Sequence, residues 1–429
     1  MVKKKLWNVL LWTLLCVNAA GLLFKAIWFG AQGTFELFLT GLVLYIPAIF
    51  GVVMALLGGG WGWLLFSLFF NLGAGVDGPL VIHTSFALSL PVPLISFALT
   101  VALLIVRGRM PTEERAALKQ SAQKRMRVAA AIGCTIAFAL YLVWLLVLSG
   151  GSRRVTPVTK YYGPCEQAGT VERIDYDSFV YDMDGTPGDA MPKYAYVYLP
   201  CGYDRERQYN ILYLSHGGGG AAENWLIEIE RDKNMIDHMI ANGEIEPLII
   251  VTPTFYQYND LTRTGSIAVN LTEIFRYELR NDLIPAVEAK YATYAGGDVS
   301  IPGLVASRDH RAFAGLSMGS MTTWASALCG NLDFFSWFGP YSAGGDAEKV
   351  LATIHDPANA DYPIHYIYNA NGTADMAFIG HKQMYNTLLS DPYFTEGENI
   401  EFTTLHLYMH DWPAWTIDLY NTLLVFFRD

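Results

Sequence analysis

The first third of this chain is dominated by apolar stretches that are long enough to cross a lipid bilayer. They lie at residues 6–29, 35–57, 61–76, 86–106 and 128–148, and the third is the shortest. A membrane-spanning helix needs about 20 mostly apolar residues. A cleavable signal peptide would not be followed by four more such stretches. We therefore expect residues 1–149 to form a membrane region with about five transmembrane helices.

Positive charge predicts how these helices are oriented. Lys3, Lys4 and Lys5 precede the first stretch, and seven further basic residues lie between positions 107 and 127, ahead of the last one. Loops rich in lysine and arginine stay on the cytoplasmic side of a membrane, so an even number of spans should separate the two basic segments. Four spans satisfy this condition, and the fifth then carries residues 150–429 to the outer face.

Residues 150–429 have the composition of a water-exposed domain. They carry 18 Lys and Arg against 36 Asp and Glu, whereas residues 1–149 carry 11 against 4. This acidic balance argues against nucleic-acid binding, which uses a basic face. Cys165 and Cys201 flank the first expected hairpin, and they either pair in an oxidising compartment or remain two separate thiols. No cysteine and histidine spacing predicts a zinc site, and we expect neither a metal nor a cofactor.

From residue 193 onward, stretches typical of strands and of helices alternate. The expected strands are 194–199, 210–215, 247–252, 311–315, 334–339, 364–370 and 402–408, and the expected helices include 231–242, 271–291 and 318–330. Such alternation predicts a mostly parallel sheet with helices on both faces. In these folds the chemistry takes place at the carboxyl ends of the strands.

The most informative motif is Gly-Leu-Ser-Met-Gly at residues 315–319. It follows a short strand and opens a helix, which is the setting of a nucleophile elbow, where a tight turn exposes the serine hydroxyl. Ser317 is therefore the candidate nucleophile. Upstream, strand 210–215 runs into His216 and four glycines, and such a loop can turn a backbone N–H toward a developing oxyanion. The N–H of Met318, just after the nucleophile, would be the second donor.

A serine nucleophile also needs a histidine base and a carboxylate that orients the base. In this kind of fold they follow in the chain order serine, acid, histidine. Asp375 comes after strand 364–370 through a turn, and Asp346, after the preceding strand, is the alternative acid. His410 lies in a loop just past strand 402–408 and is the best candidate base. We expect His381 within a helix and His406 within a strand, where a structural role is more typical.

Four segments make the chain resemble a known family. They are NILYLSHGGGGAAENW (210–225), NDLIPAVEAKYATY (281–294), HRAFAGLSMGS (310–320) and MHDWPAWTIDLYNTL (409–423). These segments resemble the feruloyl-esterase-type carbohydrate esterases of the esterase D superfamily, which are secreted α/β-hydrolases. The resemblance covers roughly residues 194–427 and none of the first 149. It implies Ser317 as nucleophile, Asp375 as acid, His410 as base, and the N–H groups of Gly218 and Met318 as the oxyanion site.

Together these features predict an α-helical transmembrane region, residues 1–149, followed by an extracytoplasmic α/β-hydrolase domain, residues 150–429. The expected function is hydrolysis of carbohydrate esters, of feruloyl or acetyl type by the resemblance, through an acyl-enzyme at the outer membrane face. The aromatic side chains of Trp225, Tyr256, Tyr258 and Trp412 either line a substrate pocket or pack in the core. Two other functions stay open, namely acyl transfer to a sugar, as in the related mycolyltransferases, and a non-catalytic membrane sensor or scaffold.

Overall fold

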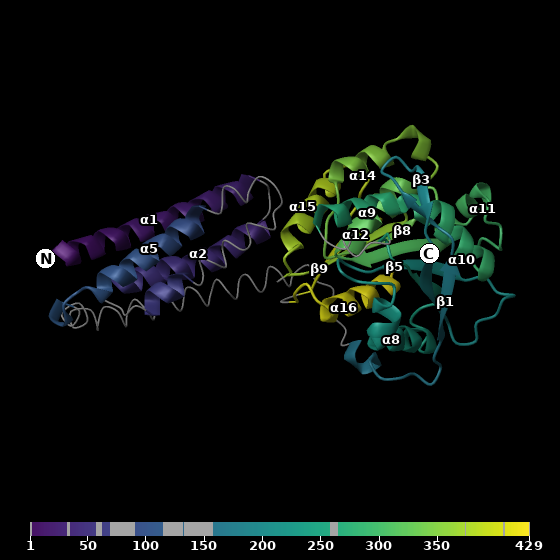
Figure 1. Ribbon diagram of the computed structural model, residues 1–429, viewed down its shortest axis with the longest axis horizontal. Coiled ribbons are helices and arrows are strands. Elements are labelled where there is room, and N and C mark those ends of the chain that lie inside the picture. Colours follow the sequence, from purple (N-terminus) through teal and green to yellow (C-terminus); the bar gives the residue numbers. More distant parts are fainter. Residues whose placement is uncertain are drawn as a thin grey trace. The chain divides into compact units, whose positions relative to one another are not determined.

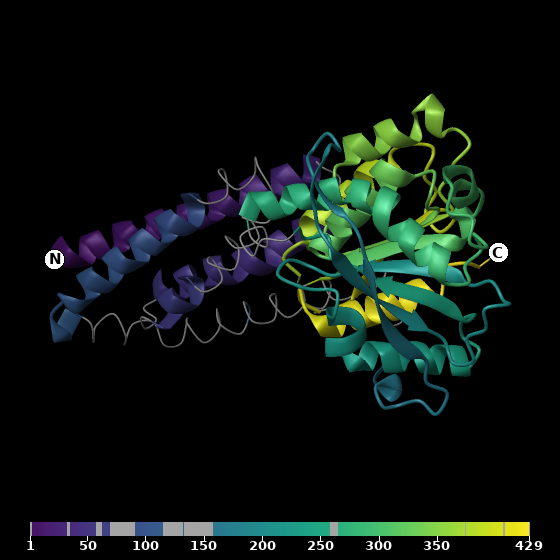
Figure 2. The same ribbon diagram turned by 45° about the vertical axis from the view of Figure 1, so that its right-hand side comes forward.

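The chain forms two compact units, Met1–Gly151 and Ser152–Asp429, in the computed structural model shown in Figure 1 and Figure 2. The structure describes residues 2–31, 35–56, 62–68, 91–114, 132, 158–257, 265–373, 375–405 and 408–428.

The described part of the first unit consists mainly of three long helices. They are α1 (Val2–Ala31), α2 (Phe35–Leu56) and α5 (Pro91–Gly108), and α1 packs against both of the others. Their shared interior holds apolar side chains, including Trp7, Leu11, Val52 and Leu103. A cluster contributed by helices far apart in the sequence gives this unit a core of its own.

Among the described residues, one helix is long and apolar enough to cross a membrane, judged by length and composition, at Leu6–Leu23 within α1. Shorter apolar helices occupy Tyr45–Leu56 and Leu94–Gly108. Residues 62–68 are helical within the expected span 61–76, whose remainder lies outside the described residues, as does span 128–148 apart from residue 132. The described helices thus include one span of the required length, and the number five stays a prediction.

The first unit exposes many apolar side chains and buries several polar ones. The buried polar residues include Asn18, Ser96 and Thr100. The Asn18 Nδ2 atom donates to the Leu14 carbonyl at 2.8 Å, and the Thr100 Oγ1 atom donates to the Ser96 carbonyl at 2.7 Å. These bonds within a helix satisfy polar groups without water. The exposed apolar residues include Leu6, Val9, Trp12, Leu23, Leu94, Ile95, Phe97, Val101 and Ile105.

The second unit is built on an eight-stranded, mostly parallel sheet in the order β1-β4-β6-β5-β7-β8-β9-β10. Strands β1 and β4 and strands β4 and β6 pair antiparallel, and the pairs from β6 to β10 are parallel. The strands are β1 (Thr170–Tyr176), β4 (Lys193–Leu199), β5 (Asn210–Ser215), β6 (Leu248–Thr252), β7 (Arg311–Leu316), β8 (Trp337–Tyr341), β9 (Tyr366–Gly372) and β10 (Ile400–Leu405). A separate hairpin joins β2 (Phe179–Tyr181) to β3 (Pro187–Ala190).

Helices cover both faces of this sheet, as Figure 2 shows. On one face lie α8 (Glu230–Ala241) and α16 (Trp412–Leu423), and on the other lie α9 (Gly265–Glu278) and α12 (Met318–Thr322). The other α-helices that the structure describes in this unit are α10 (Ile284–Lys290), α11 (Ile301–Ala306), α13 (Cys329–Asn331), α14 (Ala347–Ile354) and α15 (Phe378–Leu389). The predicted mostly parallel sheet between helical layers is thereby confirmed for this unit.

Several predicted elements differ from the structure in their bounds, and two of these differences are informative. The helix predicted for 271–291 begins at Gly265 and continues through a π-helical turn, Leu279–Leu283, into α10. Strand β8 begins three residues later than predicted, because Phe334 lies in a turn and Phe335 in irregular backbone. The Phe334 carbonyl accepts a hydrogen bond from Arg311 Nη1 at 2.7 Å, and the Phe335 carbonyl accepts one from Arg308 Nη2 at 2.8 Å. These carbonyls are therefore paired with arginine side chains instead of with the backbone of a neighbouring strand.

The two cysteines near the first hairpin do not form a disulfide. Cys165 and Cys201 are both free thiols, and Cys201 is exposed in the turn that follows β4. Of the two alternatives left open by the sequence, separate thiols are therefore the observed one.

Candidate active site

Ser317 occupies a sharp turn between strand β7 and helix α12. Its φ of 53° and ψ of −116° are rare for a residue with a side chain. Its N–H donates to the Tyr341 carbonyl at 2.8 Å, which ties the turn to the neighbouring strand β8. A Cβ atom on Gly315 would lie 2.6 Å from the Gly319 carbonyl carbon, so the two glycines of the motif permit the close return of the chain. The turn leaves the serine side chain half-exposed at the carboxyl end of the sheet.

The structure brings together the three residues predicted to act with one another. The His410 Nε2 atom lies 3.0 Å from the Ser317 Oγ atom. The His410 Nδ1 atom lies 2.9 and 3.0 Å from the two carboxylate oxygens of Asp375. A carboxylate can only accept, so it selects the tautomer with a proton on Nδ1 and leaves Nε2 free to take the serine proton.

The sheet positions the acid and the base. Strands β9 and β10 are parallel neighbours, so the loops that follow them, which carry Asp375 and His410, leave the same edge. The Asp375 side chain is fully buried, and its Oδ1 atom also accepts from the Ala377 N–H at 2.7 Å. The His410 side chain remains about one-fifth exposed, at 19%. The acid is therefore held rigidly, while the base faces the solvent side where an ester would enter.

The alternative acid and the other histidines lie in structural positions. Asp346 caps the amino end of α14, where its Oδ1 atom accepts from the N–H groups of Glu348 and Lys349 at 3.0 and 3.2 Å. His381 is buried on α15, with its ring nitrogens 3.0 Å from the side-chain oxygens of Asn371 and Asn369. Burial lowers the pKa of His381 to about 3, so this ring is neutral.

His406 lies outside the described residues, so the prediction of a structural role for it stays a prediction.

The glycine-rich loop after β5 lies against the serine turn. A Cβ atom on Gly217 would be 3.2 Å from the Ser317 Cβ atom, and one on Gly218 would be 3.1 Å from the Met318 sulfur. Gly219 has a φ of +72°, and its N–H donates to the Tyr256 Oη atom at 2.8 Å. The two N–H groups predicted to form the oxyanion site thus belong to adjoining backbone segments beside Ser317.

The aromatic residues proposed to line a substrate pocket lie in different environments. Trp225 is 1% exposed, its Nε1 atom donates to the Ser215 carbonyl at 3.0 Å, and it belongs to the core. Its ring meets the half-buried ring of Trp412 edge-on at 5.0 Å. Tyr256 is 5% exposed, and Tyr258 lies outside the described residues. Trp225 thus packs in the core, whereas Trp412 is partly exposed and could contact a ligand.

Each of the three predicted catalytic residues adjoins a methionine. Met318 follows Ser317, Met376 follows Asp375 and Met409 precedes His410. Met376 is 50% exposed and Met409 is 60% exposed. The residues next to the acid and the base in the sequence therefore carry flexible thioether side chains that reach solvent.

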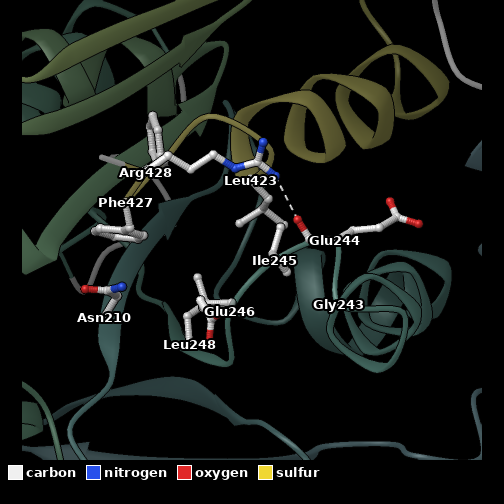
Figure 3. Close-up of a pocket in the computed structure, with 10 residues that line it drawn as sticks. Asn210, Gly243, Glu244, Ile245, Glu246, Leu248, Leu423, Phe427 and Arg428 are labelled. Carbon is white, nitrogen blue, oxygen red and sulfur yellow. Dashed lines mark hydrogen bonds between the residues drawn. The ribbon is translucent and has the colours of Figure 1, made fainter.

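A cavity at the opposite end of the sheet has no part in this arrangement. It has a volume of about 260 Å³ and lies where β5 and β6 begin, as Figure 3 shows. The Arg428 Nη2 atom donates across its wall to the Glu244 carbonyl at 2.8 Å. It is lined by Asn210, Gly243, Glu244, Ile245, Glu246, Leu248, Leu423, Phe426, Phe427 and Arg428. None of the predicted catalytic residues is among them.

The arrangement at the carboxyl end of the sheet suits acyl transfer. It contains a hydroxyl, an imidazole base and a buried acid in one hydrogen-bonded series. Within the described residues, no group of three or more His, Cys, Asp or Glu side chains is placed to hold a metal ion.

Comparisons with known proteins agree with this chemistry. The Esterase family model matches residues 192–342, wholly within the second unit. Endo-1,4-beta-xylanase Y of Acetivibrio thermocellus is 32% identical over 282 residues, which are 63% of this chain and 24% of that protein. This chain therefore spans about a quarter of the length of that curated relative.

Two solved structures are similar over nearly their whole length. A protein named FAE has 31% identity and a TM-score of 0.55, over 65% of this chain and 95% of that one. The feruloyl esterase module from Clostridium thermocellum, solved as a serine-to-alanine variant with sinapinate, has 30% identity and a TM-score of 0.54. That match covers 65% of this chain and 94% of the module.

Proposed function

Because the second unit of this chain belongs to the feruloyl-esterase-type carbohydrate esterases, we propose that the chain hydrolyses acyl esters of carbohydrates with Ser317 as nucleophile. The enzyme is a serine carboxylic-ester hydrolase. The observation that carries the proposal is the continuous series from Ser317 through His410 to Asp375, with contacts of 3.0 and 2.9 Å.

In the proposed reaction, the Ser317 Oγ atom attacks the ester carbonyl while the His410 Nε2 atom takes its proton. The negative charge that develops on the carbonyl oxygen is stabilised by the N–H groups of Gly218 and Met318. His410 then returns the proton to the leaving sugar hydroxyl, and an acyl-enzyme remains on Ser317. Water, deprotonated by the same imidazole, releases the acid and restores the serine. Asp375 holds the ring in the required tautomer and stabilises its charged form throughout.

The substrate we propose is an aromatic or acetyl ester on a plant-type polysaccharide. The similar module was solved with sinapinate, and the similar curated protein is named a xylanase. The half-buried ring of Trp412, two residues from His410, offers an apolar face for an aromatic acyl group or a sugar ring.

We further propose that the first unit anchors this enzyme in a membrane through about five spans, with the second unit outside. The exposed apolar side chains of α1 and α5 favour an apolar environment. A reporter fused after Asp429 should be external, and one inserted between residues 107 and 127 should be cytoplasmic. Both reporters on one side would contradict the five-span topology.

One assay separates hydrolysis from the two other functions. Membranes that contain the full chain are incubated with a chromogenic feruloyl ester, with and without a sugar acceptor, and the products are identified. Ferulic acid formed equally in both conditions supports hydrolysis, whereas acylated sugar formed at its expense identifies a transferase. No turnover, together with no labelling of Ser317 by a fluorophosphonate, would identify a non-catalytic protein.

A further inference from the structure

The glycine-rich loop beside Ser317 is fixed by a side chain from a different segment. The Gly219 N–H donates to the Tyr256 Oη atom at 2.8 Å. Gly219 directly follows Gly218, whose N–H is one of the two proposed oxyanion donors. A run of four glycines has more backbone freedom than any other sequence of that length, so an external contact is needed to keep that N–H aimed in one direction.

A second contact ties the same two segments together. The His216 Nε2 atom, at the start of the loop, lies 2.8 Å from the Thr254 Oγ1 atom, which also accepts from the Tyr256 N–H at 3.2 Å. The His216 ring stacks on Phe255 with ring centres 4.7 Å apart. The loop is therefore joined to residues 254–256 at both Thr254 and Tyr256.

Residues 254–256 are in turn anchored by a buried ion pair. The Lys193 Nζ atom donates to the Thr254 carbonyl at 2.6 Å and to the Glu278 Oε2 atom at 2.7 Å. The Tyr176 hydroxyl donates to the other oxygen of Glu278 at 2.7 Å. The side chains of the pair are 5% and 4% exposed. Charges this deeply buried hold their partners in one geometry, because losing a partner leaves an uncompensated charge in the interior.

We propose that Tyr256 is a positioning residue for ester hydrolysis, whose hydroxyl holds the glycine-rich loop with the Gly218 N–H aimed at the developing oxyanion. Thr254 acts in the same way through His216. This role rests on the proposed function, and it assigns Tyr256 to the support of the backbone rather than to the substrate pocket. Donors that are already oriented need no rearrangement when the charge develops, so their contribution appears in the transition state.

The test is Tyr256→Phe in the full chain, purified in detergent. We expect kcat for a chromogenic feruloyl ester to fall about tenfold to a hundredfold, less than the roughly 10²–10³-fold loss seen when an oxyanion donor is removed outright. KM should stay within about twofold, because the ground-state ester does not depend on the oxyanion contacts. The affinity for a boronate, which mimics the tetrahedral state, should fall in parallel with kcat, while the affinity for ferulate stays constant.

Tyr209→Phe is the matched control. Tyr209 is also buried, at 2% exposure, and its Oη atom accepts a backbone N–H, that of Asp204, at 3.0 Å. It precedes the amino end of β5, away from the site, so its loss should leave kcat unchanged. Thr254→Val should lower kcat several-fold and Thr254→Ser should restore it, which provides a second test if Tyr256→Phe does not fold.

The outcomes distinguish this role from the function on which it rests. An inactive wild-type enzyme that is not labelled by a fluorophosphonate contradicts the proposed function. An active wild type whose folded Tyr256→Phe variant keeps kcat and boronate affinity contradicts only the role of Tyr256. A raised KM with unchanged kcat also contradicts it, because that result would place Tyr256 in contact with the substrate.

Discussion

The two units of this chain differ in where their apolar side chains lie: many are exposed in the first, and most are buried in the second. In the first unit, described side chains such as Trp12 and Leu23 are 59% and 61% exposed, while Asn18 and Thr100 are buried. In the second unit, each strand of the parallel part of the sheet is almost entirely buried, and apolar side chains from α8 and α16 join one core with the strands. The first arrangement is what the proposed membrane location predicts, and the second is typical of a closed apolar core.

The comparison shows that the number of apolar residues alone does not tell whether they form a core or an outer surface. Both units are rich in apolar residues, and only their placement on each helix or strand tells which side faces the solvent. All the predicted catalytic residues lie in the second unit, and the predicted membrane helices lie in the first. The predictions below test this separation.

The largest effect should come from removing the nucleophile. Ser317→Ala should lower kcat by roughly 10⁶-fold, and His410→Ala should lower it nearly as much, because the two residues act as a unit. Ester hydrolysis in membranes measures the loss, and fractionation should show unchanged membrane association. Substantial activity left in Ser317→Ala would mean that the chemistry is not confined to this site.

Replacing the acid should have a smaller effect. Asp375→Asn should lower kcat by roughly 10⁴-fold, since the amide no longer selects the tautomer or stabilises the charged ring. Asp346→Asn, which changes only a helix cap, should keep kcat close to that of the wild type in the same assay. A larger loss from Asp346→Asn than from Asp375→Asn would reverse the assignment of the acid.

A buried carboxyl in the second unit should make its stability depend on pH. Burial raises the pKa of Asp232 from 3.8 to about 7, and its Oδ1 atom accepts from the Thr416 hydroxyl at 2.6 Å. Between about pH 4 and pH 7 the folded state therefore binds more protons than the unfolded state, so the free energy of unfolding falls as pH rises through this window.

Asp232→Asn keeps an acceptor for Thr416 but does not titrate. It should raise the free energy of unfolding at pH 8 by on the order of 4 kcal/mol at most, from about 1.4 kcal/mol per unit of pKa shift, and change little at pH 4. Thermal unfolding at both pH values measures the difference. Equal pH dependence in variant and wild type would show that Asp232 is ionised in the folded protein.

The last prediction compares the outer surfaces of the two units directly. Val101 on α5 is 39% exposed and Val269 on α9 is 42% exposed. A lysine near the middle of a membrane helix costs about 3 kcal/mol, whereas a surface substitution in water usually stays within about 0.5 kcal/mol. Val101→Lys should therefore reduce the amount of chain that resists extraction from membranes, and Val269→Lys should not. Equal amounts for both variants would contradict the proposal that α5 faces lipid.

The sequence predicted the meeting of Ser317, His410 and Asp375 because each of them carries a local signal. The Gly-Leu-Ser-Met-Gly motif lies after a strand and before a helix, and this setting predicts the sharp turn directly. The two loops that carry the acid and the base each follow an apolar strand, and parallel strands bring such loops to one edge. None of these inferences depends on how side chains pack.

Other features depend on packing between distant segments, which the sequence does not reveal. Phe334 and Phe335 read as the start of a strand, yet arginines from before and within β7 bind their carbonyls. For Tyr256 the sequence left a pocket position and core packing open, and its contact with Gly219, on which the proposed support of the loop rests, could not be predicted. The only feature of the sequence that placed Tyr256 near the site was its position after the carboxyl end of β6. For Trp225 the same two alternatives were open, and the structure shows core packing.

The methionines next to the three predicted catalytic residues are sensitive to oxidants, whereas the serine hydroxyl is not. Oxidants convert an exposed thioether into a sulfoxide, which is polar and bulkier. Met376 and Met409, at 50% and 60% exposure, would react before the partly covered Met318. Peroxide would therefore modify side chains next to the acid and the base in the sequence while the nucleophile stayed intact. The resistance of the enzyme to oxidants would thus depend on these methionines and not on Ser317.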